Sequence, residues 1–343
     1  MRVGLITAKE TVELVEFDDP APAADEIVVA IDRCGICGSD VHAYVEGWRY
    51  APGVCGHEWV GRVAASGSDV TNVTEGDLVT GGVAPGCGAC PECRADLSQY
   101  CRAARSRYFG RDAPTSGGFA PYFCLHAERA VAIPDTIPVD TAALIEPASV
   151  ALHAVRKSQL RIGDVACVVG CGPIGLLTAQ CALVGGAGLV IAIEPDERRR
   201  AMALQTGAHH AVAPGDEARE LINNVTNSLG ADIAYDCAGI PQTMQQSVDL
   251  VRQGGSVCMI GVSGGTAEVK PMRWMNKEVV FDTSLVFTLD EMLTVADLIV
   301  DGRLDVAPLH EGTIDLDDLP GTIDDLAAKR NDRIKILVDP TAG

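Results

Sequence analysis

The feature that most constrains the fold is a change of pattern between residues 165 and 194. An apolar run, VACVV, is followed by the turn GCGPIG, by the apolar stretch LLTAQCALVG, and by a second apolar run, LVIAI, that ends at Glu194. Short runs rich in β-branched residues predict buried strands, and the longer stretch between them predicts a helix. A strand–helix–strand unit of this kind belongs in a parallel sheet, so we expect an α/β fold with a doubly wound sheet.

The turn itself has the spacing G-x-G-x-x-G, formed by Gly170, Gly172 and Gly175, with Pro173 and Ile174 between the last two. In such a turn the first glycine makes the tight bend and the third lets the helix pack on the strand. The second lets a pyrophosphate approach backbone N–H groups at the helix start. The motif alone is weak, but in this context it predicts a dinucleotide site.

The acidic residue that ends the second strand bears on the choice of dinucleotide. Glu194 comes 24 residues after Gly170 and is placed to accept hydrogen bonds from ribose hydroxyls. It would repel a 2′-phosphate, which favours NAD over NADP. Three arginines, 198–200, follow it and give the opposing signal, because arginines there can serve a 2′-phosphate; they also suit a solvated helix face.

The alternation of strands and helices continues to about residue 285 and gives six candidate strands. The residues before 150 have a different pattern. Short valine-rich runs separated by glycines and turns predict a compact, barrel-like β domain. We therefore expect two domains, which a chain of 343 residues can accommodate.

The β region contains a cluster of metal-ligand residue types between positions 33 and 58. Cys37 offers a thiol, His57 an imidazole and Glu58 a carboxylate, and Ser39 and His42 lie at short spacing from the thiol. Cysteine, histidine and a carboxylate are the ligands of a zinc site that keeps one position open.

A second cluster of cysteines lies in a loop containing glycine and proline. Its spacing is C-x2-C-x2-C-x7-C, formed by Cys87, Cys90, Cys93 and Cys101. Four thiolates can close around one tetrahedral zinc and leave no position for a substrate, so this site is expected to fix the loop. The alternative, disulfide-bonded cysteines, is disfavoured in a cytoplasmic chain.

A carboxylate further along could complete the open site. Glu146 precedes Pro147 in the segment LIEPASV, and proline at a first helical position predicts that a helix begins there. A carboxylate at a helix start is also a common partner of the helix dipole. The spacing alone leaves both readings open.

Charge and hydropathy exclude several classes of protein. The net charge is −20, which repels phosphate backbones and argues against a nucleic-acid partner. The sequence has no apolar run of about 20 residues and no signal peptide at its start, so we expect no membrane association and a cytoplasmic location. A chain of this length with clustered cysteines uses them to bind metal more readily than to form disulfides.

Taken together, these residues resemble the zinc-dependent medium-chain alcohol dehydrogenases. The parts that carry the resemblance are CGICGSDVH, GHExxGxV, the four-cysteine lobe, LIEPASV and GxGPIG, which occur in this order along essentially the whole chain. The chain looks closest to the polyol branch, which includes sorbitol-, threonine- and butanediol-type dehydrogenases. Three features point there: Glu58 directly follows His57, Glu146 stands where the alcohol branch has a cysteine ligand, and Ser39 replaces a threonine.

The resemblance implies a fold and two zinc ions per chain. Residues 1–150 and 287–343 would form a GroES-like β-barrel catalytic domain, and residues 151–286 a Rossmann NAD(P)-binding domain. Cys37, His57 and Glu146 would hold the catalytic zinc, with Glu58 as a ligand directly or through water. The structural zinc would be held by the lobe, namely Cys87, Cys90, Cys93 and Cys101.

The resemblance also implies roles in proton transfer and cofactor binding. Ser39 would take the substrate hydroxyl proton and pass it through the nicotinamide ribose towards His42. The cofactor, NAD in preference to NADP, would be held by Gly170, Gly172, Pro173, Ile174, Gly175, Glu194, Arg199 and Lys335. Lys335 corresponds to a basic residue that approaches the pyrophosphate in relatives.

The activity implied is hydride transfer between NAD(P) and a small secondary alcohol, polyol or diol, or the matching ketone. Threonine, glucose and simple or aryl alcohols are alternative substrates, and relatives are homodimers or homotetramers. The other classes are a zinc-free reductase, a silent zinc- and NAD-binding protein, and a zinc-ribbon nucleic-acid binder. Aromatic and basic residues that could line the pocket are Tyr44, Trp48, Tyr50, Phe109, Arg111 and Phe119.

Overall fold

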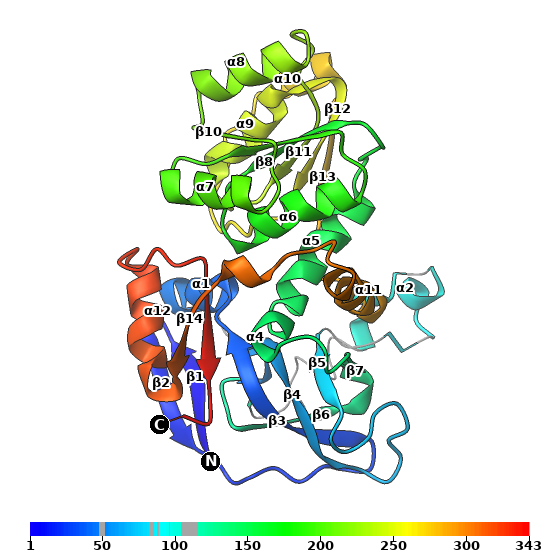
Figure 1. Cartoon of the computed structure of the whole chain (residues 1–343), viewed down its shortest axis with the longest axis vertical. Coiled ribbons are helices and arrows are strands. Elements are labelled where there is room, and N and C mark those ends of the chain that lie inside the picture. Colours follow the sequence, from blue (N-terminus) through cyan, green and yellow to red (C-terminus); the bar gives the residue numbers. More distant parts are fainter. Residues whose placement is uncertain (48–51, 83–85, 88, 96, 104–115, 343) are drawn as a thin grey trace. The chain divides into compact units, whose positions relative to one another are not determined.

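The computed structural model describes residues 1–47, 52–82, 86–87, 89–95, 97–103 and 116–342. These residues form two compact units (Figure 1). Unit 1 comprises Met1–Glu146, Phe287–Val300 and Val306–Gly343, and unit 2 comprises Pro147–Val286 and Asp301–Asp305. The short segment 301–305 is held in unit 2 by Gln180, whose side-chain amide donates to the carbonyl of Asp305 at 2.9 Å and accepts from its N–H at 2.8 Å.

Unit 2 is built on a six-stranded parallel sheet in the order β10-β9-β8-β11-β12-β13. The strands are β8 (Val165–Val169), β9 (Leu189–Ile193), β10 (His210–Val212), β11 (Ala231–Asp236), β12 (Val251–Met259) and β13 (Val280–Thr283). The helices are α6 (Pro173–Val184), α7 (Glu197–Gln205), α8 (Asp216–Val225), α9 (Pro241–Leu250) and α10 (Pro271–Lys277).

The strand order of this sheet reverses at β8. Crossovers between parallel strands are right-handed, so the reversal places helices on both faces of the sheet. The predicted doubly wound sheet is therefore confirmed. Its core consists of the β-branched side chains that marked the strands in the sequence, including Val169, Ile191 and Val257, which are at most 5% exposed.

Unit 1 contains a mixed seven-stranded sheet and a two-stranded β1–β2 sheet. The strands are β1 (Arg2–Ala8), β2 (Thr11–Glu16), β3 (Glu26–Gly35), β4 (Glu58–Ser66), β5 (Leu78–Gly81), β6 (Tyr122–His126), β7 (Ala130–Ala132), β14 (His310–Asp315) and β15 (Lys335–Asp339). The helices are α1 (Gly38–Glu46), α2 (Pro91–Arg94), α4 (Val139–Ala142), α11 (Leu289–Val300) and α12 (Leu319–Ala327), and α5 (Ile145–Lys157) begins in this unit and continues into unit 2.

The longest strand, β3, is the centre of this sheet. Along one edge it pairs with β4, and along the other it pairs first with β6 and then, at Cys34 and Gly35, with β15. The strands enclose a core that contains Trp59 and Phe123, whose rings meet edge to face at 5.7 Å. Because β15 comes from the chain end, the sheet of unit 1 depends on residues from both ends of the sequence.

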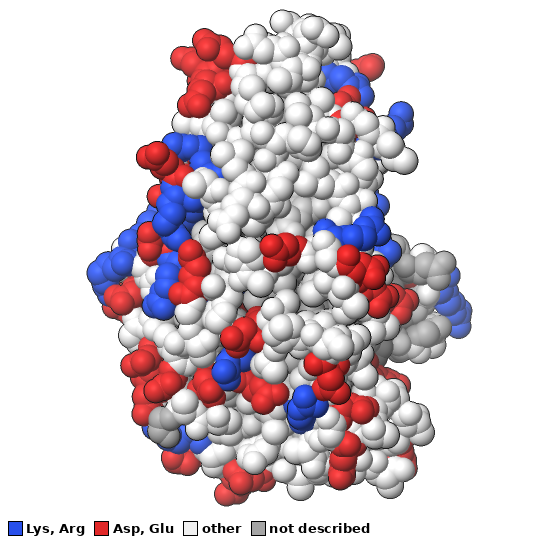
Figure 2. All heavy atoms as spheres, in the orientation of Figure 1, with Lys and Arg blue, Asp and Glu red and all other residues white. Residues whose placement is uncertain are grey.

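Acidic side chains are spread over the face drawn in Figure 2, most densely over unit 1, and the Lys and Arg side chains are interspersed with them. Within the described residues, none of the helices combines the length and the apolar character needed to cross a bilayer.

The glycines at the start of α6 generate a stability prediction. A Cβ added at Gly175 would lie 1.8 Å from the carbonyl oxygen of Gly170, whereas a Cβ at Gly172 would meet nothing within 4 Å. Gly175→Ala should therefore lower the free energy of unfolding by about 1–3 kcal/mol through overpacking. Gly172→Ala, the matched control, should change it by less than about 0.5 kcal/mol. Urea unfolding of both variants checks this, and equal stability of the two would contradict the packing role of Gly175.

Candidate metal and cofactor sites

Strand pairing in unit 1 brings the ligand residues of the first cluster together. Gly35, at the end of β3, pairs with Glu58 at the start of β4. Cys37 follows β3 by two residues and His57 immediately precedes β4, so both emerge at the same end of the sheet. The Cys37 sulfur, a ring nitrogen of His57 and a carboxylate oxygen of Glu58 all lie within 4.8 Å of one another.

A glycine at position 35 is required for this arrangement. A Cβ there would lie 2.0 Å from Oε2 of Glu58, which would push the carboxylate away. On the other side Gly35 pairs with Leu337 of β15. The absence of a side chain at Gly35 thus lets the carboxylate of Glu58 lie across the end of β3.

Cys37 is fixed by the helix that follows it. It is the N-cap of α1, and its sulfur accepts a hydrogen bond from the N–H of Ser39 at 3.5 Å. Asp40, which is 0% exposed, completes a capping box by accepting from the N–H of Cys37 at 2.9 Å. We did not single out Asp40 from the sequence, although the three-residue spacing from a capping side chain to an acidic residue is a recognisable signal.

The imidazole of His57 is oriented by its neighbours. Its Nδ1 lies 3.0 Å from the carbonyl oxygen of Val54 and 4.0 Å from a carboxylate oxygen of Asp40. An N–H at Nδ1 donates to Val54, which leaves the lone pair of Nε2 available for a metal. Burial by itself lowers the pKa of His57, but the charges of Cys37 and Asp40 raise that pKa well above its usual value.

Glu58 forms a buried ion pair with Lys335 of β15. The ammonium group lies 2.8 Å and 2.5 Å from the two carboxylate oxygens and also donates to the carbonyl of Ile36 at 2.9 Å. Lys335 is 2% exposed and Glu58 is 1% exposed. The contact of Lys335 with a cofactor pyrophosphate stays a prediction, and in this structure its ammonium group is bonded to Glu58 and a backbone carbonyl.

Glu146 lies in the first turn of α5 and is 8% exposed. Burial raises the pKa of its carboxyl to about 7, while the nearby charge of His57 lowers it and that of Glu58 raises it. The charges of His57 and Glu58 thus lie close enough to change the pKa of Glu146, so Glu146 is near the cluster. It is not among the three residues whose ligand atoms lie within 4.8 Å of one another.

The charges of this region fit a bound cation. Asp40, Glu58 and Glu146 are buried carboxylates, and Cys37 adds a thiol, whereas Lys335 contributes one positive charge. Burying carboxylates without compensating charge is costly. A divalent ion bound by thiolate, imidazole and carboxylate would supply that charge, and zinc accepts this set of donors.

Ser39 and His42 lie on one face of α1, three residues apart. The hydroxyl of Ser39 lies 3.5 Å from Nε2 of His57, which places it beside the metal-ligand cluster. His42 is 38% exposed in its side chain, and its Nδ1 lies 3.6 Å from the carboxylate of Glu46. One of the two residues is thus next to the cluster and the other is at the surface.

Two of the aromatic residues predicted to line the pocket do not do so. Tyr44 is 7% exposed and donates from its hydroxyl to Asp324 at 2.9 Å, and Phe119 is 1% exposed in the core of unit 1. Aromatic residues in these positions fill the core. The other candidates, Trp48, Tyr50, Phe109 and Arg111, lie outside the described residues.

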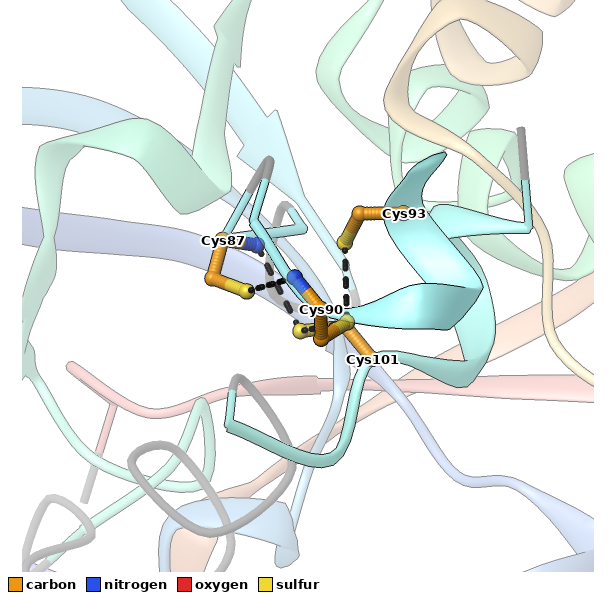
Figure 3. A group of neighbouring side chains, drawn as sticks. All are labelled: Cys87, Cys90, Cys93 and Cys101. Carbon is orange, nitrogen blue, oxygen red and sulfur yellow. Dashed lines mark hydrogen bonds between the residues drawn. The ribbon is translucent and has the colours of Figure 1, made fainter. Parts of the chain in front are cut away.

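The four cysteines of the second cluster converge around one point (Figure 3). The sulfur of Cys90 lies 3.4 Å from that of Cys93 and 3.7 Å from that of Cys101. These separations are far longer than a disulfide bond of about 2.05 Å. They are close to the distance of about 3.8 Å between sulfurs in a zinc tetrahedron with bonds of about 2.3 Å.

Backbone groups of the lobe support the same arrangement. The N–H of Cys90 donates to the sulfur of Cys87 at 3.4 Å, and the N–H of Cys87 donates to the sulfur of Cys101 at 3.4 Å (Figure 3). Such bonds stabilise thiolates, which are the metal-binding form of cysteine. The donor set therefore fits a closed zinc site.

In unit 2 the glycine turn joins β8 to α6. Gly170 has φ +90°, in the left-handed region that favours glycine, and Gly175 lies against its carbonyl. Gly172 is the N-cap of α6 and has no side chain-to-backbone cap. The N–H groups of this helix start are thus open to an anion such as a pyrophosphate.

Glu194 lies just beyond β9 and is 6% exposed. One of its carboxylate oxygens accepts from the N–H of Cys171 at 2.7 Å and the other from the N–H of Asp196 at 3.1 Å. The carboxylate thus holds the glycine turn in place through its hydrogen bond with Cys171. The guanidinium of Arg200 donates to the backbone carbonyl of Glu194 at 2.9 Å. The backbone N–H of Arg199 donates to the carboxylate of Asp196 at 2.9 Å.

The buried pair of Glu58 and Lys335 leads to a stability prediction. Lys335→Met leaves the carboxylate of Glu58 buried without its partner, so the free energy of unfolding should fall by about 3–5 kcal/mol. The double variant Lys335→Met/Glu58→Gln removes both charges and should recover a large part of that loss. Denaturant unfolding of the single and double variants measures this difference. A single variant as stable as the parent would contradict the pairing.

Comparison with known proteins identifies the family of this chain. Residues 23–135 match the family described as alcohol dehydrogenase GroES-like domain, and residues 173–301 match the family described as zinc-binding dehydrogenase. The sorbitol dehydrogenase of Bacillus subtilis is 35% identical over 270 residues, which cover 76% of this chain and 75% of that protein. An L-threonine 3-dehydrogenase of Caldanaerobacter subterraneus is 32% identical over 271 residues, covering 76% of this chain and 77% of that protein.

A solved structure extends the similarity to the whole chain. The crystal structure of a zinc-binding dehydrogenase from Sinorhizobium meliloti 1021, bound to NADP, has a TM-score of 0.88 and 31% identity and covers 99% of both chains. The class of protein follows from the similarity in sequence and fold, together with the two sets of zinc-type ligands. The chain belongs to the zinc-dependent medium-chain alcohol and polyol dehydrogenase family, and it is a zinc-dependent oxidoreductase of alcohols or polyols that uses a nicotinamide cofactor.

Proposed function

We propose that Cys37, His57 and Glu146 hold a catalytic zinc in unit 1, and that Glu58 joins them directly or through water. The observation that carries this proposal is the convergence of a thiol, an imidazole and a carboxylate within 4.8 Å beside a further buried carboxylate. When bound, such a zinc supplies Lewis-acid polarisation of a substrate oxygen. The four cysteines of the lobe hold a second, structural zinc, which gives two zinc ions per chain.

The residues of α1 provide the route for the substrate proton. Ser39, whose hydroxyl lies 3.5 Å from Nε2 of His57, would accept the proton of the substrate hydroxyl and pass its own through the nicotinamide ribose towards His42. His42 passes the proton to water, since its ring is partly exposed and has Glu46 beside it. General base catalysis of this kind contributes about 10²–10⁴ to the rate.

Unit 2 is proposed to hold the cofactor, with its pyrophosphate at Gly172 and the adenosine ribose near Glu194. When bound there, the nicotinamide ring would supply the hydride acceptor or donor. NAD is the proposed cofactor because the buried carboxylate of Glu194 would repel a 2′-phosphate. The NADP in the Sinorhizobium meliloti structure and the arginines 198–200 of this chain support the alternative.

The proposed substrate is a secondary alcohol, polyol or vicinal diol, in line with the sorbitol and threonine dehydrogenases that this chain resembles. An assay of NAD⁺ reduction across sorbitol and other polyols, 2,3-diols, threonine, glucose and simple or aryl alcohols distinguishes the alternatives. Turnover of none of them by protein that binds NADH would favour a silent zinc- and NAD-binding protein. We also propose that the protein is a homodimer or a homotetramer, which light scattering tests. Its proposed location is the cytoplasm.

The catalytic assignment predicts the effect of removing His57. His57→Ala should lower kcat/KM more than about 100-fold, which exceeds the loss of about 10–100-fold typical of residues that only orient a metal ligand. It should also reduce the bound zinc from two ions per chain to one. His126→Ala is the control, because His126 is also a partly buried histidine of unit 1 but pairs with Asp25. Activity assays and elemental analysis provide the measurements. A His57→Ala variant with near-normal activity and zinc content would contradict the assignment.

The cofactor assignment makes a separate prediction. The unaltered enzyme should use NAD⁺ with a kcat/KM at least about tenfold higher than NADP⁺, which corresponds to about 1.4 kcal/mol of discrimination. Glu194→Ser should narrow this ratio by removing the carboxylate. Steady-state kinetics with both cofactors measures it, and a preference of the unaltered enzyme for NADP⁺ would overturn this use of Glu194.

A further inference from the structure

An arginine near the end of β3 links three segments of unit 1. Nε of Arg33 donates to Oδ1 of Asp140 in α4 at 2.9 Å, and Nη1 donates to Oδ2 of Asp339 in β15 at 2.9 Å. Nη1 also donates to the carbonyl of Asp32 at 2.6 Å. One guanidinium thus joins a strand, a short helix and the last strand of the chain.

Each of the three segments leads directly to a residue of the proposed catalytic site. Arg33 precedes Cys37 by four residues, and Asp140 precedes Glu146 by six. Asp339 ends β15, the strand that begins with Lys335, the partner of Glu58. The guanidinium therefore links the segment that leads to Cys37, the segment that leads to Glu146, and the strand that carries the partner of Glu58.

The connection from Asp140 to Glu146 is stiff. Backbone hydrogen bonds run from Ala143 to Val139 at 3.1 Å and from Leu144 to Thr141 at 3.0 Å. Leu144 is 0% exposed, as is Ile145, which begins α5. A shift of α4 would therefore be transmitted to the start of α5 and to Glu146, rather than absorbed by a loose loop.

The partners of Arg33 are themselves oriented. The second oxygen of Asp140 lies 3.8 Å from Nδ1 of His310 in β14. The second oxygen of Asp339 accepts from the N–H of Thr341 at 3.0 Å and from its hydroxyl at 2.6 Å. The β3–β4 register also shifts between Ile31 and Arg33, a bulge of the kind that re-aims a side chain.

We propose that Arg33 is a positioning residue that sets the separation between the Cys37 segment and the Glu146 segment, and so the geometry of the catalytic metal site. This inference rests on the proposed ligand role of Glu146. A planar guanidinium can hold two carboxylates in fixed directions at once, whereas a lysine ammonium is a point charge without this geometry. The side chain of Arg33 is 27% exposed, so the ion pairs are partly shielded from water.

The test uses Arg33→Gln, Arg33→Lys and Asp140→Asn. Arg330→Gln is the matched control, because Nε and Nη2 of Arg330 also bind two different carboxylates, Asp325 and Asp324, in the same unit. Two properties are measured besides turnover. These are the rate at which a chelator removes the first zinc equivalent and the visible spectrum of enzyme whose catalytic zinc has been exchanged for Co²⁺.

Arg33→Gln and Asp140→Asn should each release that zinc about 10–100-fold faster, the range typical of residues that orient metal ligands, and should alter the cobalt spectrum. kcat should fall by a larger factor than KM changes. Arg33→Lys should recover part of the zinc retention and part of the kcat that Arg33→Gln loses. Arg330→Gln should change neither readout. Asp140→Asn and Arg33→Lys keep the test decisive if Arg33→Gln does not fold.

The proposal is overturned if Arg33→Gln and Asp140→Asn match Arg330→Gln in zinc release and cobalt spectrum. Glu146→Gln separates this failure from that of the proposed function. If Glu146→Gln accelerates zinc release and the Arg33 and Asp140 variants do not, the ligand set is supported and the positioning role is wrong. If Glu146→Gln leaves zinc release and the spectrum unchanged, the ligand set itself is wrong, and the role of Arg33 fails with it.

Discussion

The pairing of β3 with β4 on one edge and β15 on the other is the interaction on which the site in unit 1 depends. At Gly35 the three strands meet, with Glu58 opposite on one side and Leu337 on the other. Because Gly35 has no side chain, the carboxylate of Glu58 can cross the end of β3 and reach Lys335. The strand pairing sets the place where Cys37 and His57 converge, and it brings Glu58 to Lys335, which lies 277 positions further along the chain.

The same pairing concentrates negative charge in a buried place. Asp40 completes the capping box of Cys37, Glu58 lies against Lys335, and Glu146 lies in the first turn of α5. Burying these carboxylates in their charged form is costly unless cations compensate them. Lys335 provides part of the compensation, and a metal ion bound beside Cys37 and His57 would provide more. The residues around the proposed zinc would thus contribute to both folding and chemistry.

Local patterns in the sequence were enough to predict the doubly wound parallel sheet of unit 2. The strands β8 and β9, the glycine turn and the acid at Glu194 are close together in the chain, and each is recognised by residue type and period. The capping bond of Asp40 and the buried pairing of Lys335 with Glu58 were not predicted, for different reasons. Asp40 carries only a short-range capping signal, whereas the partner of Lys335 comes from strand pairing between the two chain ends. Tyr44 and Phe119 show a further limit, since an aromatic residue type does not reveal whether its side chain packs in the core or lines a pocket.

The central claim is that Cys37, His57 and Glu146 bind one catalytic zinc beside an intact Glu58–Lys335 pair. A crystal structure of the zinc-loaded enzyme, with anomalous scattering measured on both sides of the zinc edge, tests it most directly. The account predicts a peak about 2.3 Å from the sulfur of Cys37 and about 2.0–2.2 Å from a nitrogen of His57 and an oxygen of Glu146. Absence of a peak at this cluster, or a zinc bound there without Glu146, would contradict the account.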